Sequence, residues 1–457
     1  MPSPGTGPAS ARKALILAAR IRGHLLQVSP ARLLFAGYLF YALAGWAILS
    51  LPLAQTAPLA PLDTLFTATS ALSTTGLATV DTGTSFTGFG QAAVLVLIQL
   101  GGLGYMTVSS FVFLAWRHRL SGFRVKTTRA AFGLPETVAP AAFLGSVVVF
   151  TLAVELVGAF VLSVIFYHRG VEGFVWQAVF HSVSAFCTAG FSLFPTSLEA
   201  FRTDANLLMV LSVLSILSSV GFLIVTDIWT WIIGRAPRLG YSSRVILTMT
   251  TVLIALGTVL FLAVTPAPPG TSDGQRVLDA FFQAMSASTT VGFNSVPIGG
   301  VVPAAMLALM ALMLIGASPA GTGGGLKTTS VAALWGVLAA TLTGRSSVSF
   351  RGATLPDRRI RAAVAAFLAY ILLSFAGLFI LLVTEAGAAF EALLFEVLSA
   401  LSTVGLSMGV TGALSDAGKA VIVLLMFAGR VGVISFGLAL TFRRASAAEE
   451  PVEDIIL

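Results

Sequence analysis

The chain has 457 residues, of which 56% are hydrophobic and only 10% are charged, and its formal net charge is +7. A soluble core of ordinary proportions cannot bury so much apolar surface, so the composition predicts a membrane protein and excludes an ordinary soluble one. The single cysteine, Cys187, excludes an intrachain disulfide and argues against a cysteine metal cluster.

The chain begins with a predicted cytoplasmic arm, in which residues 11–27 form at most a basic amphipathic helix. Eight apolar stretches follow, each long enough to cross the hydrocarbon core, which needs about 20 residues. They cover residues 33–53, 91–116, 141–167, 207–233, 245–264, 303–342, 362–383 and 419–442. The sequence therefore predicts an all-α, multi-pass membrane protein.

Basic residues are concentrated in the connections on one side. Most of the 26 Lys and Arg residues lie in the N-terminal arm, in every second link between spans and after the last span. Because such links stay in the cytoplasm, we expect both termini to be cytoplasmic. The high isoelectric point follows from this topology, so we do not expect nucleic-acid binding. The opposite links carry acids that fit either a cation-attracting vestibule or ordinary solvated loops, namely Asp63, Glu172, Asp273, Glu385 and Asp416.

One phrase occurs four times along the chain: Phe, three residues, Ser-Ala, two residues, Thr, any residue, Gly, and then Leu or Phe. Its copies end at Gly76, Gly190, Gly292 and Gly405, so units of roughly a hundred residues are predicted. The predicted divisions are 1–31 for the arm, 32–117, 118–235, 236–344 and 345–443 for four pore repeats, and 444–457 for a cytoplasmic tail.

Each predicted repeat holds two spans and, between them, a stretch too short to cross the membrane. These stretches cover residues 62–75, 174–189, 277–291 and 389–404, and their apolar spacing predicts half-length re-entrant helices that end in a turn. Non-helical backbone is tolerated at membrane depth only where protein or water surrounds it. We therefore expect four pseudo-symmetric turns to face one central pore, where their carbonyls could replace a cation's hydration shell. The negative ends of the half-helices would also favour a cation there.

A secondary transporter with broken helices and a midplane substrate site is the alternative to a pore. Repeats of such transporters are often inverted, which requires an odd number of spans in each. Here every predicted repeat has two spans and basic flanks on the same side, so the copies are parallel. This pattern favours the pore.

The four turns, STTG at 73–76, CTAG at 187–190, TTVG at 289–292 and STVG at 402–405, resemble the filters of the KtrB/TrkH/HKT superfamily of K⁺ transporters. Two further motifs support this resemblance, GASPAGTGGGLKTTS at 316–330 and GRVGVISF at 429–436. It covers essentially the whole chain. The KtrB branch is the nearer match, since TrkH members carry an additional N-terminal helical pair.

The resemblance implies a K⁺-selective uptake channel or transporter subunit of a bacterial Ktr-type system. It also implies a homodimer in the lipid bilayer, gated by a cytosolic RCK (KtrA-type) ring that binds nucleotide. Na⁺ is a candidate activator, and no organic cofactor is expected in this chain. The implied K⁺ ligands are the backbone carbonyls of Thr74, Thr75, Gly76, Thr188, Ala189, Gly190, Thr290, Val291, Gly292, Thr403, Val404 and Gly405.

The choice between K⁺ and Na⁺ depends on the first turn. In plant relatives, Ser at the first filter glycine accompanies Na⁺ preference, whereas this chain has Gly76. The resemblance therefore favours K⁺. A Na⁺-permeating relative of the same fold and a coupled secondary transporter remain the alternatives.

Residues 316–327 interrupt the sixth apolar stretch with a proline and a run of glycines, a composition that breaks an α-helix. The segment is not a phosphate-binding Walker A loop, because Leu326 stands where that motif needs glycine before the lysine. The resemblance implies an intramembrane gating loop below the filter, whereas a glycine kink for helix packing is the alternative. The implied gating residues are Gly316, Ala317, Ser318, Pro319, Ala320, Gly321, Thr322, Gly323, Gly324, Gly325, Lys327 and Arg430.

Arg430 lies inside the eighth apolar stretch, where a charge needs water or a partner. The resemblance implies that it projects into the pore beneath the filter, whereas a salt bridge to an acid is the alternative. Glu155 and Asp227 are candidate partners for Arg430 or Lys327.

Polar residues also lie nine positions before three of the turn glycines. His181, Gln283 and Glu396 occupy this position, where the first repeat has Thr67, and we expect them to brace the filter by hydrogen bonds. No Ser/His/Asp or paired-carboxylate arrangement stands out, so we expect no enzyme.

Overall fold

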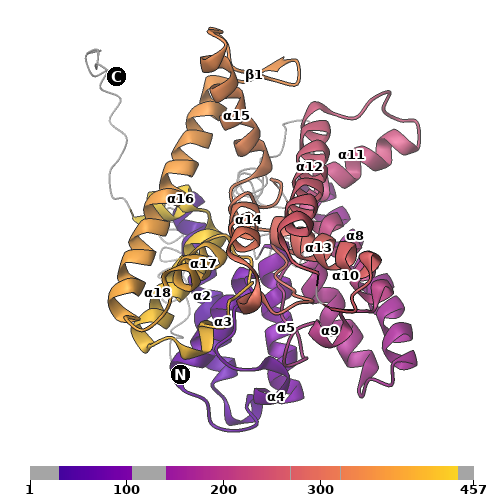
Figure 1. Ribbon diagram of the computed structural model, residues 1–457, viewed down its shortest axis with the longest axis vertical. Coiled ribbons are helices and arrows are strands. Elements are labelled where there is room, and N and C mark those ends of the chain that lie inside the picture. Colours follow the sequence, from indigo (N-terminus) through magenta and orange to yellow (C-terminus); the bar gives the residue numbers. More distant parts are fainter. Residues whose placement is uncertain (1–29, 105–139, 268, 320, 441–457) are drawn as a thin grey trace, which may run out of the picture.

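The computed structural model describes residues 30–104, 140–267, 269–319 and 321–440. The N-terminal arm to residue 29, the link at 105–139, Ala320 and the tail from 441 lie outside the described residues. The described chain is mostly helical and includes one hairpin, β1 (Ser349–Phe350) with β2 (Ala353–Thr354), in which Ser349 pairs with Thr354. Figure 1 shows this hairpin at one end of the molecule and the short α4 (Thr82–Ser85) at the opposite end.

Twelve of the described helices form four units of three, which we number in chain order. Unit 1 contains α2 (Pro30–Leu49), α3 (Pro61–Ser73) and α5 (Gly88–Leu103). Unit 2 contains α8 (Pro140–His168), α9 (Phe174–Phe186) and α10 (Ala205–Val220). Unit 3 contains α12 (Tyr241–Val264), α13 (Asp273–Thr289) and α14 (Pro303–Leu314), and unit 4 contains α16 (Asp357–Thr384), α17 (Phe390–Leu401) and α18 (Asp416–Val431).

The middle helix of each unit lies where the sequence predicted a half-length helix. These helices have 12 to 17 residues, or roughly 18–26 Å, which is less than the hydrocarbon thickness of about 30 Å. Among the described residues, α8, α12 and α16 are long and apolar enough to cross a membrane, and α10 with its bent continuation could make a fourth span. Hence the first helices of three units carry the clearest membrane-spanning character.

The last apolar stretches of units 2 and 4 are not the single helices that their composition predicted. α10 is followed by α11 (Phe222–Ile232) after a 97° bend, and α18 is followed by α19 (Val433–Leu440). In unit 3, residues 315–319 and 321–327 between α14 and α15 (Thr328–Leu342) are not helical, as the proline and glycines of this segment predicted. Gly221 and Gly432, at the breaks in units 2 and 4, have φ of 99° and 90°, values through which a right-handed helix cannot continue.

The repeated phenylalanine interlocks the four units. Each of these rings is fully buried, and each packs in the apolar cluster of the preceding unit rather than in its own. Phe180 of unit 2 lies among the side chains of α2, α3 and α5, and Phe66 of unit 1 closes the cycle against unit 4. Phe282 and Phe395 pack in the same way against units 2 and 3. Burial of one such ring contributes about 1.5–3 kcal/mol, which explains a phenylalanine at this position in every copy.

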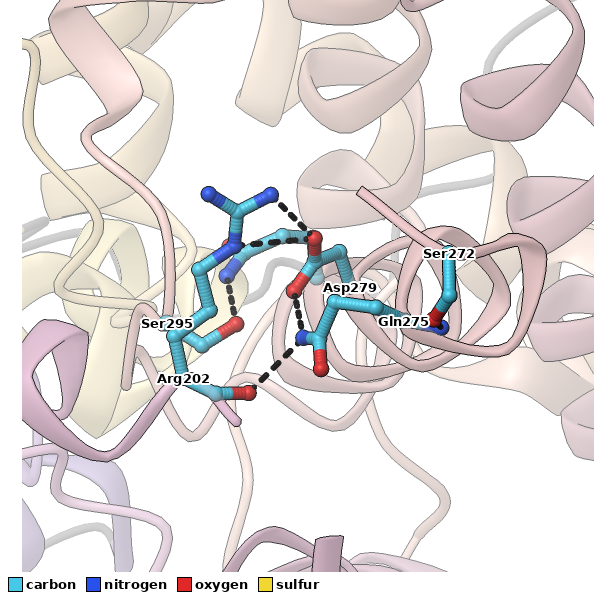
Figure 2. Close-up of polar contacts among 6 residues, drawn as sticks. Arg202, Ser272, Gln275, Asp279 and Ser295 are labelled. Atoms are coloured by element: carbon cyan, nitrogen blue, oxygen red, sulfur yellow. Dashed lines mark hydrogen bonds and ion pairs between the residues drawn. The ribbon is translucent and has the colours of Figure 1, made fainter. Parts of the chain in front are cut away.

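Ion pairs connect two of the unit boundaries. Arg202, just before α10, donates from Nε and Nη2 to Asp279 Oδ2 of α13 at 3.0 and 2.6 Å, and Gln275 holds the other carboxylate oxygen (Figure 2). The hydrogen bond to Asp279 raises the pKa of Arg202 above its ordinary value. Lys419 of α18 binds Asp63 of α3 at 2.7 Å, and Asp63 and Asp279 both lie 13 residues before their turn glycines. These pairs link unit 2 to unit 3 and unit 4 to unit 1.

We expect Asp279→Ala to lower stability by about 1–3 kcal/mol, because it removes a buried acceptor of three hydrogen bonds. The measurement is the apparent midpoint of thermal unfolding of the purified protein in detergent. Asp273→Ala on the same helix is the control, because that carboxylate is 99% exposed and its pair with Arg276 spans 3.6 Å. The control is expected to change stability by less than about 0.5 kcal/mol. Equal shifts in the two variants would contradict a structural role for the Arg202–Asp279 pair.

Candidate functional site

The four middle helices end in the same turn. Thr74, Thr188, Thr290 and Thr403 have φ between 51° and 61°, in the left-handed region that ends a helix. The N–H of the next residue then donates to the carbonyl of the serine in the Ser-Ala pair of the phrase, at 2.8–3.1 Å in all four copies. The Thr-x-Gly phrase therefore has one backbone conformation in every unit.

The serine of the phrase binds the backbone next to the glycine. Ser70 and Ser399 accept from the N–H of Gly76 and Gly405 at 3.1 and 3.0 Å. Ser184 and Ser286 instead donate to the carbonyls of Phe191 and Phe293 at 2.8 and 2.6 Å. These hydroxyls are fully buried, so each serine fixes the exit of its turn.

The four turns contact one another in cyclic order. A Cβ placed on Gly76 would lie closer than 3.0 Å to the carbonyl oxygen of Ala189, and one on Gly190 would meet that of Val291. A Cβ on Gly292 would meet the carbonyl oxygen of Val404, and one on Gly405 would meet that of Thr75. Each glycine thus lies directly against the middle carbonyl of the next turn. We call this arrangement the turn ring, comprising residues 74–76, 188–190, 290–292 and 403–405.

A cavity opens on one side of the turn ring, and all four glycines line it. Its wall contains the carboxylates Asp81 and Glu199, and no basic side chain among the described residues lines it. The sequence had offered Asp63 and Glu385 as acids of a vestibule. Asp63 instead pairs with Lys419, and Glu385 accepts hydrogen bonds from Ser415. The cavity is therefore acidic, but through different residues from those expected.

The polar residues nine positions before the turn glycines bind the segment that follows their own turn. His181 Nε2 lies 2.9 Å from Ser192 Oγ, and Gln283 donates to Ser295 at 3.3 Å. Glu396 accepts from Ser407 at 2.8 Å and from Thr411. Thr67 instead donates to the carbonyl of Asp63 in its own helix. The expected brace is thus present in units 2, 3 and 4, within each unit rather than around the ring.

The non-helical segment between α14 and α15 packs against the turn ring from the side opposite the cavity. Thr322 Oγ1 lies 3.1 Å from Thr188 Oγ1, and the N–H of Gly324 donates to Thr290 Oγ1 at 3.0 Å. A Cβ on Gly324 would clash with Thr403. The segment, defined here as the crossing loop (residues 315–327), therefore contacts three of the four turns at their threonines.

Two basic side chains bind the crossing loop through backbone carbonyls. Arg430 donates to the carbonyl of Thr322 and to those of Gly101 and Gly102 in α5 of the neighbouring unit 1. Lys327 donates to the carbonyl of Gly323 at 2.7 Å. The sequence had suggested Glu155 or Asp227 as acidic partners. Asp227 instead accepts from the N–H of Gly240, and Glu155 from Gln99.

The breaks in the last helices of units 2 and 4 were not anticipated. Gly221 follows Ser-Ser-Val and Gly432 follows Gly-Arg-Val, so the two sites share only a valine before the glycine, which is a weak signal. The break in unit 2 exposes carbonyls that the crossing loop uses: Ser318 donates from N–H and Oγ to the carbonyl of Ser219, at 3.1 and 2.9 Å. The break therefore anchors the loop.

Comparison with known proteins agrees with this architecture. A model of the TrkH family, described as cation transport protein, matches residues 41–448. The chain is 33% identical to Ktr system potassium uptake protein B of Bacillus subtilis (90% of this chain, 93% of that protein). It is 34% identical to the protein of the same name from Vibrio alginolyticus (93% and 94%) and 33% identical to potassium/sodium uptake protein NtpJ of Enterococcus hirae (97% and 99%).

A solved structure shares the fold. The crystal structure of the potassium transporter TrkH from Vibrio parahaemolyticus is 22% identical in sequence, with a TM-score of 0.69 over 89% of this chain and 85% of that one. The relatives named above are membrane transporters, which fits the expectation that the chain is not an enzyme.

Proposed function

Since this chain belongs to the TrkH family of cation transport proteins, we propose that it is the K⁺-conducting membrane subunit of a bacterial Ktr-type potassium uptake system. Ions would pass along the axis of the turn ring, between four pseudo-symmetric units of span, re-entrant pore helix and span. The family and the apolar helices make the protein membrane-embedded.

The cyclic contact of the four glycines with the next turn's carbonyl is the observation that carries this proposal. Backbone oxygens from four turns at one level can replace the water shell of a cation. The C-terminal ends of α3, α9, α13 and α17, which carry a partial negative charge, lead directly into those turns. The acidic cavity on the same axis would raise the local concentration of cations.

The crossing loop and Arg430 are the proposed gate, because the loop contacts the threonines of the ring and Arg430 binds the loop. We further propose a homodimer in the inner membrane with cytoplasmic termini, on a cytosolic RCK ring that moves the loop. The basic link at 345–361, which contains the β1–β2 hairpin, is a largely exposed surface that such a ring could contact.

A Na⁺-permeating transporter is the second candidate, because one similar relative is named a potassium/sodium uptake protein. Gly76 at the first turn, where plant relatives with Na⁺ preference have Ser, favours K⁺. A coupled transporter with a separate midplane site is less consistent with a cavity that all four glycines share.

Bacterial cells that lack their own K⁺ uptake systems provide the test. We expect this chain, expressed with a KtrA-type subunit, to restore growth at low K⁺ and to carry K⁺ in preference to Na⁺. Uptake of each ion is measured by flame photometry after K⁺ depletion, with cells carrying the empty vector as control. Equal uptake of both ions would favour the Na⁺-permeating alternative, and uptake of neither would overturn the proposal.

A further inference from the structure

A buried polar cluster lies beside the second turn, between α5, α8 and α9. Glu155 of α8 is only 5% exposed, and its Oε2 accepts from Gln99 Nε2 of α5 at 3.1 Å. Its Oε1 lies 3.7 Å from the thiol sulfur of Cys187, and its backbone carbonyl accepts from Ser182 at 2.7 Å. An acid in such surroundings needs hydrogen-bond partners, and all of these partners lead to the second turn or to unit 1.

Cys187 connects this cluster to the turn ring. It is fully buried and directly precedes Thr188, whose hydroxyl donates to its carbonyl at 2.7 Å. The thiol also lies 3.5 Å from Gln99 Oε1, so its single S–H can donate either to Glu155 or to Gln99. A Cβ on Gly102 would lie 2.5 Å from the sulfur, so α5 leaves the thiol no free space. Position and packing of Cys187 therefore determine where the second turn begins.

The other units differ at the corresponding places. Tyr370 lies 35 residues before Gly405, as Glu155 lies 35 residues before Gly190, and it donates to the carbonyl of Leu401 at 3.3 Å. The side-chain hydroxyl of Ser402, the counterpart of Cys187 in unit 4, has no hydrogen-bond partner among the described residues. The first helices of units 2 and 4 thus both bind the region of their own turn from this position. Unit 2 uses an acid, Glu155, which also binds α5 of the neighbouring unit 1.

We propose that Glu155, held by Gln99, is a positioning residue that fixes the second turn against unit 1 and thereby sets the preference for K⁺ over Na⁺. It acts through Cys187 and touches no permeant ion. The inference rests on the proposed function, since a preference between ions requires that the turn ring conduct them. A side chain that ends in two polar atoms suits this position because it can bond an amide and a thiol at the same time.

The chain's only cysteine makes the inference testable without measuring transport. In purified protein, reaction of N-ethylmaleimide with Cys187, followed by intact mass spectrometry, reports whether the thiol has been released. We expect Glu155→Leu to be modified at least about tenfold faster than the wild type, the order expected for a lost hydrogen bond. Gln99→Leu should act in the same direction from α5. Glu155→Gln, which retains two hydrogen-bonding atoms, should behave as the wild type.

The second readout is the ratio of K⁺ to Na⁺ uptake in transport-deficient cells. Glu155→Leu and Gln99→Leu should lower this ratio by about tenfold, whereas Glu155→Gln should keep the wild-type ratio. Leu156→Ala, at a side chain 70% exposed on the same helix, should change neither readout. Faster modification with an unchanged ratio would reduce Glu155 to a packing role and overturn the inference, as would unchanged modification in both leucine variants. A wild type that carries no ion would refute the proposed function, while the modification rates would still report the brace.

Discussion

Gly405→Ser is expected to reduce the ratio of K⁺ to Na⁺ uptake by tens of fold, the order expected when a liganding group is displaced by about 1 Å. The new Cβ would clash with the carbonyl oxygen of Thr75, which belongs to the adjacent turn of the ring. Since φ at Gly405 is 94°, the substitution also strains its own backbone. Uptake of both ions in transport-deficient cells, with expression checked by immunoblot, gives the ratio.

Gly409→Ser separates the clash from the strain. Gly409 has φ of 93°, almost the same value, but a Cβ there would meet nothing within 4 Å. This control should therefore keep the wild-type ion preference, although its own backbone is strained to the same degree. If both variants lost discrimination equally, backbone strain rather than the turn ring would be responsible. If Gly405→Ser kept the wild-type ratio, discrimination would occur elsewhere, as the coupled-transporter alternative requires.

The middle helices and their turns were predictable because every residue of the repeated phrase has a local or cyclic task. The phenylalanine fills the preceding unit, the serine binds the backbone at the glycine, and the threonine takes the left-handed conformation. Four copies of the same phrase imply four copies of these contacts. The sequence therefore predicted where the half-length helices lie and which residues end them.

The breaks in the last helices and the partners of Arg430 were not predictable in the same way. Apolar character continues across Gly221, and a single glycine in an apolar helix is common in membrane proteins, so composition alone indicates a continuous span. The partners of Arg430 are carbonyls of Thr322, Gly101 and Gly102. Every residue has a backbone carbonyl, so the sequence does not indicate which carbonyls will bind an arginine. A search of the sequence for partners of a charge finds only acidic side chains.

Replacement of Arg430 by Ala is expected to raise K⁺ flux by about tenfold, because the guanidinium joins the crossing loop to α5 directly beneath the ring. Its hydrogen bonds to the carbonyl of Thr322 and to those of Gly101 and Gly102 would be lost, each contributing about 1.5–3 kcal/mol when the donor is charged. The substitution also removes a positive charge that opposes cations in a region of low dielectric. Tracer uptake into liposomes under a K⁺ gradient measures the flux.

Arg430→Lys distinguishes the two effects. Lysine keeps the charge but offers a point donor instead of a planar fork, so it cannot bind the loop and α5 in the same geometry. If the contacts hold the loop, the lysine variant should also conduct more than the wild type, though less than Arg430→Ala. Arg238→Ala, at an exposed position in the link between α11 and α12, is the control and should leave flux unchanged. If both Arg430 variants showed wild-type flux, Arg430 would have no part in the gate. The crossing loop would then either block the path without this side chain or not block the path.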